Sequence, residues 1–351
     1  MTDTNRPTPA AIRSFRTENP AMRERDIAAR LGVSEAALVA AETGIGATRI
    51  SADANRFLAR VAGLGEVMAL SRNESAVHEK IGIYENITPG ERAAMVLGEN
   101  IDLRIFPSRW AHGFAVSKKD GAQERLSLQF FDKAGDAVHK VHLRRASNVD
   151  AYRAMVEELR LDDQSQELLE DRSGYDDAAA ESGVDRALLR DHWSRMTDTH
   201  QFFGMLKTLK IGRQDAIRTV GDDYAWKLAD GAVARMMHDS VRDGLPIMCF
   251  VANEGIVQIH SGPIFNVQAM GPWLNVMDPT FHLHLRTDHI AEAWGVRKPT
   301  KDGHVTSLEA YGRNGEMIIQ FFGKRKEGQD ERSGWRAIME ALPKAGESAA
   351  A

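Results

Sequence analysis

The pattern of hydrophobic and polar positions predicts helices followed by strands, and this order occurs twice along the chain. In the first half, apolar residues recur at helical spacing over residues 25–41. Short apolar runs separated by turn residues follow, and hairpin-length links between them favour antiparallel pairing. The strands expected in this half are residues 101–106, 113–117, 126–131 and 139–143.

The second half is expected to repeat this plan. Residues 185–209 are predicted to be helical, and residues 111–116 (AHGFAV) align with residues 291–296 (AEAWGV) at an offset of 180. The predicted fold class is therefore α+β, a tandem structural repeat in which each half is an antiparallel β-sheet with flanking helices. The strands expected in the second half are residues 257–260, 264–270, 280–285, 291–296, 305–311 and 317–322.

The repeat also sets the domain boundaries that we expect. Residues 1–12 are predicted to be disordered, residues 13–160 to form the N-terminal repeat, and residues 186–342 to form the C-terminal repeat. Residues 161–185 are acidic and polar, which is typical of an exposed helical connector. The small residues at 343–351 are expected to fray.

Composition narrows the classes of protein. A hydrophobic share of 43% and a charged share of 27% are ordinary for a globular protein, and a net charge of −5 argues against a general nucleic-acid binder. Cys249 is the only cysteine, which suits a reducing compartment. The first ten residues lack a secretory signal, and the longest apolar stretch is too short to span a membrane. We therefore expect a soluble cytoplasmic protein without nucleic-acid partners or stable membrane insertion.

Residues 25–38 are similar to a DNA-binding helix-turn-helix. A recognition helix contacts base edges with Arg, Lys, Asn or Gln, and residues 34–43 contain none of these. They carry Glu35 and Glu42 instead, which DNA phosphates would repel. Residues 209–217 repeat the pattern, so a duplicated scaffold helix pair explains both copies.

His200 is the histidine whose context suggests chemistry. Asp198 is a candidate N-cap, and Gln201 completes a capping box that places His200 in the first helical turn. The positive end of the helix dipole disfavours a protonated imidazole, and an iron ligand must be neutral. Phe202 and Phe203 follow and suit a flat apolar ligand. Packing of His200 against the next helix explains the same pattern, and spacing alone favours that explanation.

Two other patterns are weaker. His282 and His284 alternate on a predicted strand and share a face, but no third metal ligand is evident and a packed or solvated face explains them. Basic residues lie near aromatic ones, as Arg104 does beside Phe106 and Lys298 does shortly after a tryptophan. This mixture suits a flat dianionic ligand, whereas each residue taken singly is explained by ordinary surface charge.

Together these segments resemble the HemS/ChuS-like family of bacterial cytoplasmic haem-utilisation proteins, also called hemin-degrading factors. The resemblance extends from about residue 12 to residue 342. It implies that the chain binds haem b, as ligand or substrate, in a cleft of the C-terminal half near the junction with the N-terminal half. The segments that carry it include residues 65–70 (GEVMAL), 77–80 (VHEK), 101–106 (IDLRIF), 198–203 (DTHQFF), 271–276 (GPWLNV) and 319–323 (IQFFG).

The resemblance also implies roles for individual residues. His200 corresponds to the axial ligand of the haem iron, and Arg104 and Phe106 correspond to residues on the distal side. Some relatives have tyrosine where this chain has Phe322, and a phenyl ring cannot donate a hydrogen bond, so no polar contact is transferred to that position. The positions that match the propionate contacts or the pocket rim are Arg213, Lys298, Gln320 and Arg325.

The function that the resemblance implies is receipt of imported haem and its delivery or degradation for iron acquisition. The implied partners are haem, an inner-membrane haem ABC transporter, and a haem oxygenase or reductase, and the chain would act as a monomer or dimer. An alternative is an oxygenase-like enzyme that degrades bound haem with an external reductant, in which Arg104 would be catalytic. A haem-responsive DNA-binding regulator is a third alternative, because of residues 25–38. The sequence leaves open whether the protein is an enzyme.

Overall fold

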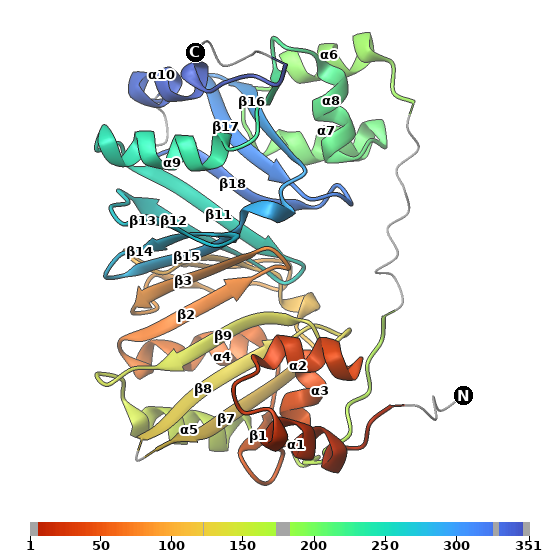
Figure 1. The fold of residues 1–351 in the computed structure, drawn as a ribbon, viewed down its shortest axis with the longest axis vertical. Helices are drawn as coiled ribbons and strands as arrows, with labels where there is room; N and C mark the ends of the chain where they lie inside the picture. Colours follow the sequence, from red (N-terminus) through yellow and green to blue (C-terminus); the bar gives the residue numbers. More distant parts are fainter. Residues whose placement is uncertain (1–5, 122, 173–182, 326–329, 347–351) are drawn as a thin grey trace. The chain divides into compact units, whose positions relative to one another are not determined.

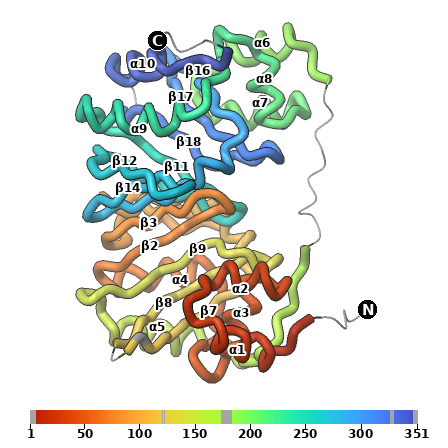
Figure 2. Tube along the Cα trace, viewed as in Figure 1, coloured from red at the N-terminus to blue at the C-terminus, as the bar shows by residue number. Residues whose placement is uncertain are grey.

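The computed structural model describes residues 6–121, 123–172, 183–325 and 330–346, and the chain divides into two compact units (Figures 1 and 2). Unit 1 comprises Met1–Arg72, His78–Tyr175 and Ala252–Gln258. Unit 2 comprises Asn73–Val77, Asp176–Val251 and Ile259–Ala351. Each unit therefore consists of one half of the chain and a short segment from the other half.

Unit 1 contains two runs of antiparallel strands, and helices cover both faces of the longer run. Its helices are α1 (Pro9–Glu18), α2 (Glu24–Leu31), α3 (Glu35–Ala40), α4 (Ala54–Val61) and α5 (Val149–Leu159), with 3-10 turns at Ala62–Leu64 and Pro107–Arg109. One run of hydrogen-bonded strands is, in order, β1 (Ala47–Ile50), β7 (His112–Asp120), β8 (Gln123–Phe131), β9 (Ala137–Leu143), β2 (Val67–Arg72) and β3 (Ala76–Gly82). A second run is β4 (Ile87–Thr88), β5 (Ala94–Leu97) and β6 (Asp102–Ile105).

Side chains alternate between the two faces of this sheet, and each face has its own core. On β7, Ala115 packs in a cluster with α4 and α5, whereas Phe114 and Val116 pack in another cluster with α3. Both sheet faces are thus covered by helices, as the sequence predicts for each half.

Unit 2 repeats the arrangement. Its helices are α6 (Arg186–Ser194), α7 (Gln201–Leu209), α8 (Arg213–Val220), α9 (Ala232–Arg242) and α10 (Ser333–Ala341), with a 3-10 turn at Thr287–His289. One strand run is β10 (Ala225–Leu228), β16 (Glu292–Thr300), β17 (Gly303–Tyr311), β18 (Met317–Gly323), β11 (Ile247–Asn253) and β12 (Ile256–Gly262). The other run is β13 (Val267–Met270), β14 (Trp273–Met277) and β15 (Phe281–Arg286).

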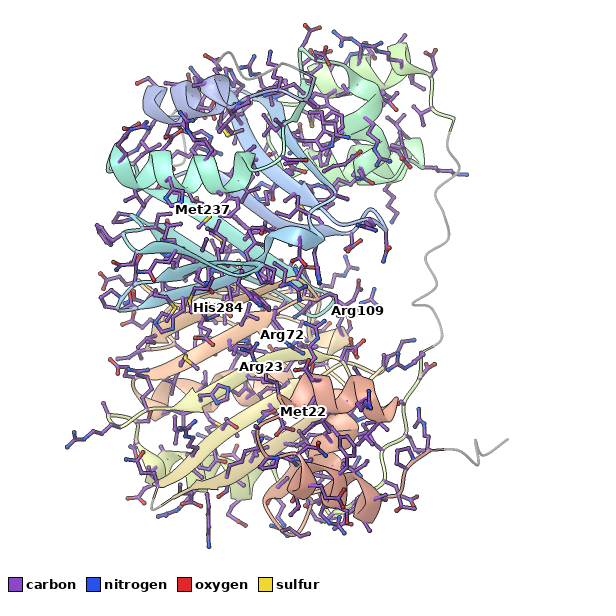
Figure 3. All side chains as sticks on the ribbon, viewed as in Figure 1. Met22, Arg23, Arg72, Arg109, Met237 and His284 are labelled. Atoms are coloured by element: carbon purple, nitrogen blue, oxygen red, sulfur yellow. The ribbon has the colours of Figure 1, made fainter. Side chains whose placement is uncertain are left out.

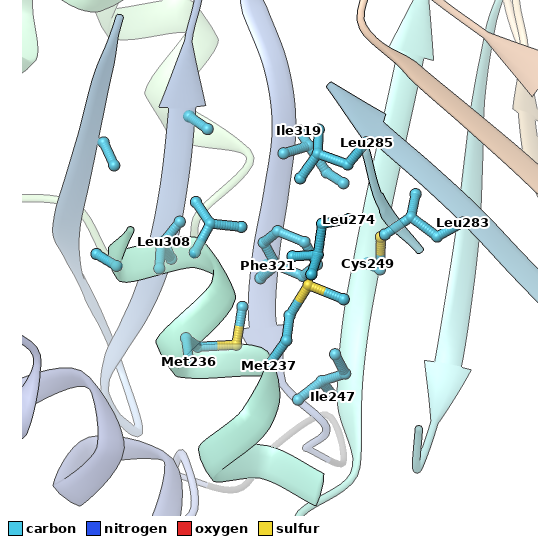
Figure 4. Packing of buried hydrophobic residues seen from close by; sticks show 14 of the residues in the cluster. Met236, Met237, Ile247, Cys249, Leu274, Leu283, Leu285, Leu308, Ile319 and Phe321 are labelled. Carbon is cyan, nitrogen blue, oxygen red and sulfur yellow. The ribbon is translucent and has the colours of Figure 1, made fainter. Parts of the chain in front are cut away.

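Two separate cores cover the faces of the unit 2 sheet. Helices α9 and α10 pack over a core that contains the fully buried Cys249 together with Leu308 and Phe321 (Figure 4). Helices α6 to α8 pack over the opposite face, against Trp294 and Val296 of β16. Any side chain that alternates in step with Trp294 therefore lies on the face beneath α6, α7 and α8.

Strand register confirms the tandem repeat. The His112–Phe131 pair of β7 and β8 corresponds to the Glu292–Tyr311 pair of β16 and β17, which lies 180 residues later. The register also shifts at Phe131 in unit 1 and at Tyr311 in unit 2, so the irregularity itself is repeated. The predicted α+β class and its duplication are confirmed.

Both long predicted helices are shorter pairs in the structure. The helix expected at residues 25–41 is α2 followed by α3, because Gly32 adopts a left-handed conformation (φ 64°) that ends α2. The helix expected at residues 185–209 is α6 followed by α7, with a turn between them that contains His200.

The segments outside the repeats are more ordered than expected. Helix α1 begins at Pro9, within the predicted disordered 1–12, because the Thr8 hydroxyl accepts a hydrogen bond from the Ala11 amide and proline suits the first turn. The connector is not helical over residues 161–172 and instead follows unit 1, where Gln164 bonds to the Arg49 backbone, and residues 173–182 lie outside the described residues. In the tail, Ala345 donates to the Lys227 carbonyl, so its first residues are held in place.

Candidate functional site

The turn between α6 and α7 is held by hydrogen bonds of its own polar side chains. Oδ1 of Asp198 accepts a hydrogen bond from the His200 amide at 2.8 Å. Oε1 of Gln201 accepts from the Thr197 amide at 2.9 Å, and its Nε2 donates to the Thr197 hydroxyl at 3.2 Å. The predicted capping box differs in its partner, because Gln201 pairs with Thr197 rather than with Asp198. His200 immediately precedes α7 instead of lying within its first turn. The turn is nevertheless fixed, and it fixes the backbone of His200.

The His200 side chain is 94% exposed and is held by Asp198. Its Nδ1 lies 2.7 Å from Oδ1 of Asp198, and no hydrogen bond joins Nε2 to any residue that the structure describes. The alternative in which His200 packs against the next helix is therefore wrong. A carboxylate on one ring nitrogen orients an imidazole and makes the other nitrogen a better metal ligand.

Asp198 stays ionised in this arrangement. The backbone N–H of His200, followed by its ring, holds the pKa of Asp198 below the ordinary value, and the charge of Arg325 contributes in the same direction. Arg325 therefore acts electrostatically on the turn that carries His200. Its assignment to a pocket rim stays a prediction.

Two phenylalanines follow His200 and differ in burial. Phe202 is 1% exposed and packs edge-to-face on Trp193 of α6, with ring centroids 5.0 Å apart. Phe203 is 66% exposed. Burial of Phe202 anchors the first turn of α7, while the exposed ring of Phe203 gives an apolar surface on the same turn as the imidazole.

Two cations rest on these rings. The Arg213 guanidinium lies 5.1 Å from the centroid of Phe202 and 5.5 Å from that of Phe203, and Nζ of Lys298 lies 4.7 Å from Phe202. These are cation–π distances. Arg213 is the first residue of α8 and Lys298 is on β16, so the fold brings a helix and a strand that are distant in sequence to the start of α7. Aromatic, cationic and imidazole groups are thus close together.

Glu309 of β17 organises the polar part of this region, and the sequence did not reveal it. It is completely buried and accepts hydrogen bonds on both oxygens. Strand alternation explains the gathering, since these strand residues point to the face beneath α7 and α8. The Glu309 cluster consists of Glu309 and its donors: Arg213 through Nε (2.9 Å) and Nη2 (2.7 Å), Lys298 (2.8 Å), Ser307 (2.8 Å), Gln320 (2.8 Å) and the hydroxyl of Tyr311.

The charges in the Glu309 cluster control one another. Burial alone would raise the pKa of Glu309, but Arg213 and Lys298 hold it well below its ordinary value. Burial lowers the pKa of Lys298 to about 8, and Glu309 opposes that shift. The pKa of Arg213 is raised, because Glu309 and Tyr311 outweigh the cost of burial. Three of the predicted propionate or pocket residues, Arg213, Lys298 and Gln320, thus meet at one carboxylate.

The remaining predicted residues lie elsewhere. Arg104 is on β6 in unit 1, where it forms an ion pair with Asp102, and Phe106 directly follows that strand. Their assignment to the distal side stays a prediction. Phe322 on β18 packs edge-to-face on Phe250, with ring centroids 5.3 Å apart, so it takes part in an aromatic contact rather than a polar one.

The strand histidines do not form a metal site. His284 on β15, which is labelled in Figure 3, pairs through Nδ1 with Oδ1 of Asn275 at 2.6 Å. Over the described part of the chain, no three His, Cys, Asp or Glu residues are grouped so that they could hold a metal ion. No helix within the same residues is long and apolar enough to cross a membrane.

Comparison with known proteins decides the family. The model of the haemin-degrading HemS.ChuX domain matches residues 32–159 and again residues 210–342. The chain belongs to this family. The two matches correspond to the two repeats, and the second contains Arg213, Lys298, Glu309 and Gln320. His200 lies between the matched ranges.

Relatives of known structure or function cover nearly the whole chain. Hemin transport protein HmuS of Yersinia pestis is 39% identical over 93% of this chain and 94% of its own length. The heme-binding protein PhuS of Pseudomonas aeruginosa, in its holo form, is 41% identical with a TM-score of 0.93, covering 96% of this chain and 100% of that one. The heme degrading enzyme ChuS of Escherichia coli O157:H7 is 37% identical with a TM-score of 0.87, covering 94% and 97%. The whole two-repeat architecture is therefore that of the HemS family.

Proposed function

We propose that this protein is a cytoplasmic haem-binding protein that receives imported haem and promotes its delivery or degradation for iron acquisition. The observation that carries the proposal is the exposed His200 imidazole, whose Nδ1 is held by Asp198 while Nε2 faces no described hydrogen-bond partner. An imidazole with one ring nitrogen held by a carboxylate and the other exposed is a suitable axial ligand for haem iron.

The surroundings of His200 suit the rest of a haem molecule. Haem b is flat and apolar, with two propionate carboxylates at one edge. The exposed ring of Phe203 offers an apolar contact, and Arg213 beside it offers a planar guanidinium that pairs well with carboxylates. In the proposal Arg325 adds positive charge at the rim, and Arg104 and Phe106 act on the side of the haem opposite His200.

The relatives support the haem assignment and leave two fates for the haem. One is described as a hemin transport protein, another as a heme-binding protein and a third as a heme degrading enzyme. As a carrier, this protein would take haem from an inner-membrane ABC transporter and pass it to a haem oxygenase. As an enzyme, it would use bound haem as its substrate, and electrons would come from a reductase or a small reductant.

Ferric haem titration of the purified protein tests the haem proposal. We expect saturation at one haem per chain with a histidine-ligated Soret band. His200→Ala should shift that band and weaken binding. His238→Ala, which alters another exposed histidine of unit 2 on α9, is the matched control and should behave like the unsubstituted protein. Equal affinity and an unchanged spectrum for His200→Ala would exclude His200 as the ligand.

A second experiment separates the enzyme from the carrier. The haem complex is incubated in air with ascorbate and catalase, where catalase removes free peroxide and so prevents coupled oxidation. Loss of the Soret band with stoichiometric release of carbon monoxide or formaldehyde supports haem degradation. An intact Soret band with rapid transfer to a haem oxygenase supports delivery.

A further inference from the structure

Burial separates the members of the Glu309 cluster into two layers. Lys298 is 3% exposed and Gln320 is 8% exposed, while Glu309 is fully buried. The side chain of Arg213 is 16% exposed and lies over the exposed Phe203. Of the predicted propionate residues in the cluster, Arg213 is the one that a ligand reaches first.

The hydrogen bonds of the cluster also indicate that Arg213 is the residue available to a ligand. Arg213 has five N–H donors, and it binds Glu309 through Nε and Nη2 in a side-on, bidentate arrangement. No hydrogen bond joins its Nη1 to any described residue, so this nitrogen keeps donors for a carboxylate. Lys298 and Gln320 instead direct their donors at Oε1 of Glu309.

The fold itself does not require a carboxylate at this position. In unit 1 the equivalent residue is Gln129, which pairs with Phe114 and Lys140 as Glu309 pairs with Trp294 and Gln320. The duplicated sheet thus accepts an amide at the same place. The carboxylate at this position is therefore specific to unit 2, which is the unit that contains His200.

We propose that Glu309 is the positioning residue of this site: it holds Arg213 side-on for a ligand carboxylate, and Lys298 and Gln320 act on that ligand through Glu309 rather than by direct contact. The inference rests on the proposed haem-binding function and deepens it. One positive charge remains when Arg213 and Lys298 are set against Glu309, which matches one carboxylate of the ligand at this position.

The protonation of Lys298 depends on the same carboxylate. The charged groups that face Lys298 are Glu309 on β17 and Arg213 on α8, while β18 contributes the neutral Gln320 and α7 the ring of Phe202. Burial has already lowered the pKa of Lys298 to about 8, and Glu309 is the group that opposes this shift. Removing Glu309 therefore removes the group that opposes the effect of burial on the pKa of Lys298.

A double-mutant cycle with two ligands tests the inference. The readout is the ratio of dissociation constants for haem dimethyl ester and haem at pH 7.5, which isolates recognition of the free carboxylates. We expect the unsubstituted protein to favour haem by about tenfold to a hundredfold, the range for hydrogen bonds to a charged group. Arg213→Met and Glu309→Gln should both bring the ratio close to one.

Lys298→Met distinguishes action of Lys298 through Glu309 from direct contact of Lys298 with the ligand. If Lys298 acts through Glu309, Lys298→Met lowers the ratio in the unsubstituted protein and leaves it unchanged in the Glu309→Gln background. A reduction by the same factor in both backgrounds means direct contact with the ligand and overturns the inference. An increased preference for haem in Glu309→Gln also overturns it, because Glu309 would then compete with the ligand for Arg213.

Controls separate positioning from loss of the fold. Glu292→Gln alters another carboxylate of the unit 2 sheet, which Arg218 and Lys227 contact, and should leave the ratio unchanged. Arg213→Lys keeps the charge but not the bidentate geometry, so it should lower the ratio nearly as far as Arg213→Met even if Glu309→Gln does not fold. A ratio that Arg213→Lys preserves would contradict positioning. Failure of the unsubstituted protein to bind haem would refute the proposed function, whereas normal binding with an additive cycle refutes only the role of Glu309.

Discussion

Oδ1 of Asp198 lies 2.7 Å from Nδ1 of His200, and the imidazole is otherwise exposed. The carboxylate thereby selects Nε2 as the nitrogen that would bind iron. We predict that Asp198→Asn, which removes the negative charge while keeping a similar shape, weakens haem binding about tenfold to a hundredfold. Asp191→Asn on α6, which removes a carboxylate paired with Arg195, is the control. Equal haem affinities for the two variants would show that Asp198 does not support the ligand.

Arg104 is predicted to affect what happens to the haem rather than whether it binds. It is a cationic donor on β6 whose ion-pair partner is Asp102. Arg104→Ala should leave the ferric Soret band of the His200 complex in place and slow ascorbate-driven loss of that band by at least about tenfold, within the range of a lost electrostatic donor. If degradation proceeds at the same rate in Arg104→Ala, Arg104 has no catalytic role.

Glu309 should also contribute to stability in a pH-dependent way. Its pKa is well below the ordinary value in the folded protein, so its stabilising effect is complete above the unfolded pKa and is lost as pH falls toward the folded pKa. Glu309→Gln leaves buried cations without their anion and should lower the free energy of unfolding by about 3 kcal/mol at pH 7. Urea unfolding should show this difference shrinking below about pH 4.5. A difference that is constant down to pH 3 would contradict the assignment.

The buried His139 of unit 1 should make a second contribution to the pH dependence of stability. It is buried between the hydroxyls of Ser71 (2.8 Å) and Tyr84 (2.6 Å), and burial lowers its pKa to about 3. An unfolded chain takes up this proton below about pH 6.5 and the folded chain does not, so stability falls as pH decreases from about 6.5 toward 3. His139→Gln should reduce the slope of unfolding free energy against pH by about 1.4 kcal/mol per unit between pH 4 and 6. An unchanged slope would mean that His139 is already protonated in the folded protein.

Much of the fold could be predicted because the alternation of apolar and polar residues and the internal repeat can both be read directly in the sequence. The 180-residue offset between residues 111–116 and 291–296 is reproduced by the register of β7 with β8 and of β16 with β17. Strands β2 and β11 were missed although their buried and partly exposed positions alternate, which is the period that predicts a strand. The helix break at Gly32 lies in the turn of the helix-turn-helix pattern at residues 25–38.

The site was less accessible from sequence because its polar contacts join distant residues. His200 could be singled out from local capping, but its exposure depends on the neighbouring elements. Glu309 appeared as an ordinary strand residue, since its partners lie on α8, β16 and β18. An acidic residue at an inward-facing position of a strand with apolar neighbours was the one signal that indicated it.

The most direct test of the account is rescue of His200→Ala by free imidazole. The substitution removes the proposed iron ligand and leaves Asp198 and Phe203 in place. We predict that ferric haem bound to His200→Ala has a shifted Soret band, and that millimolar imidazole restores the band of the unsubstituted complex. A His200→Ala complex whose band matches the unsubstituted complex without imidazole would contradict the account.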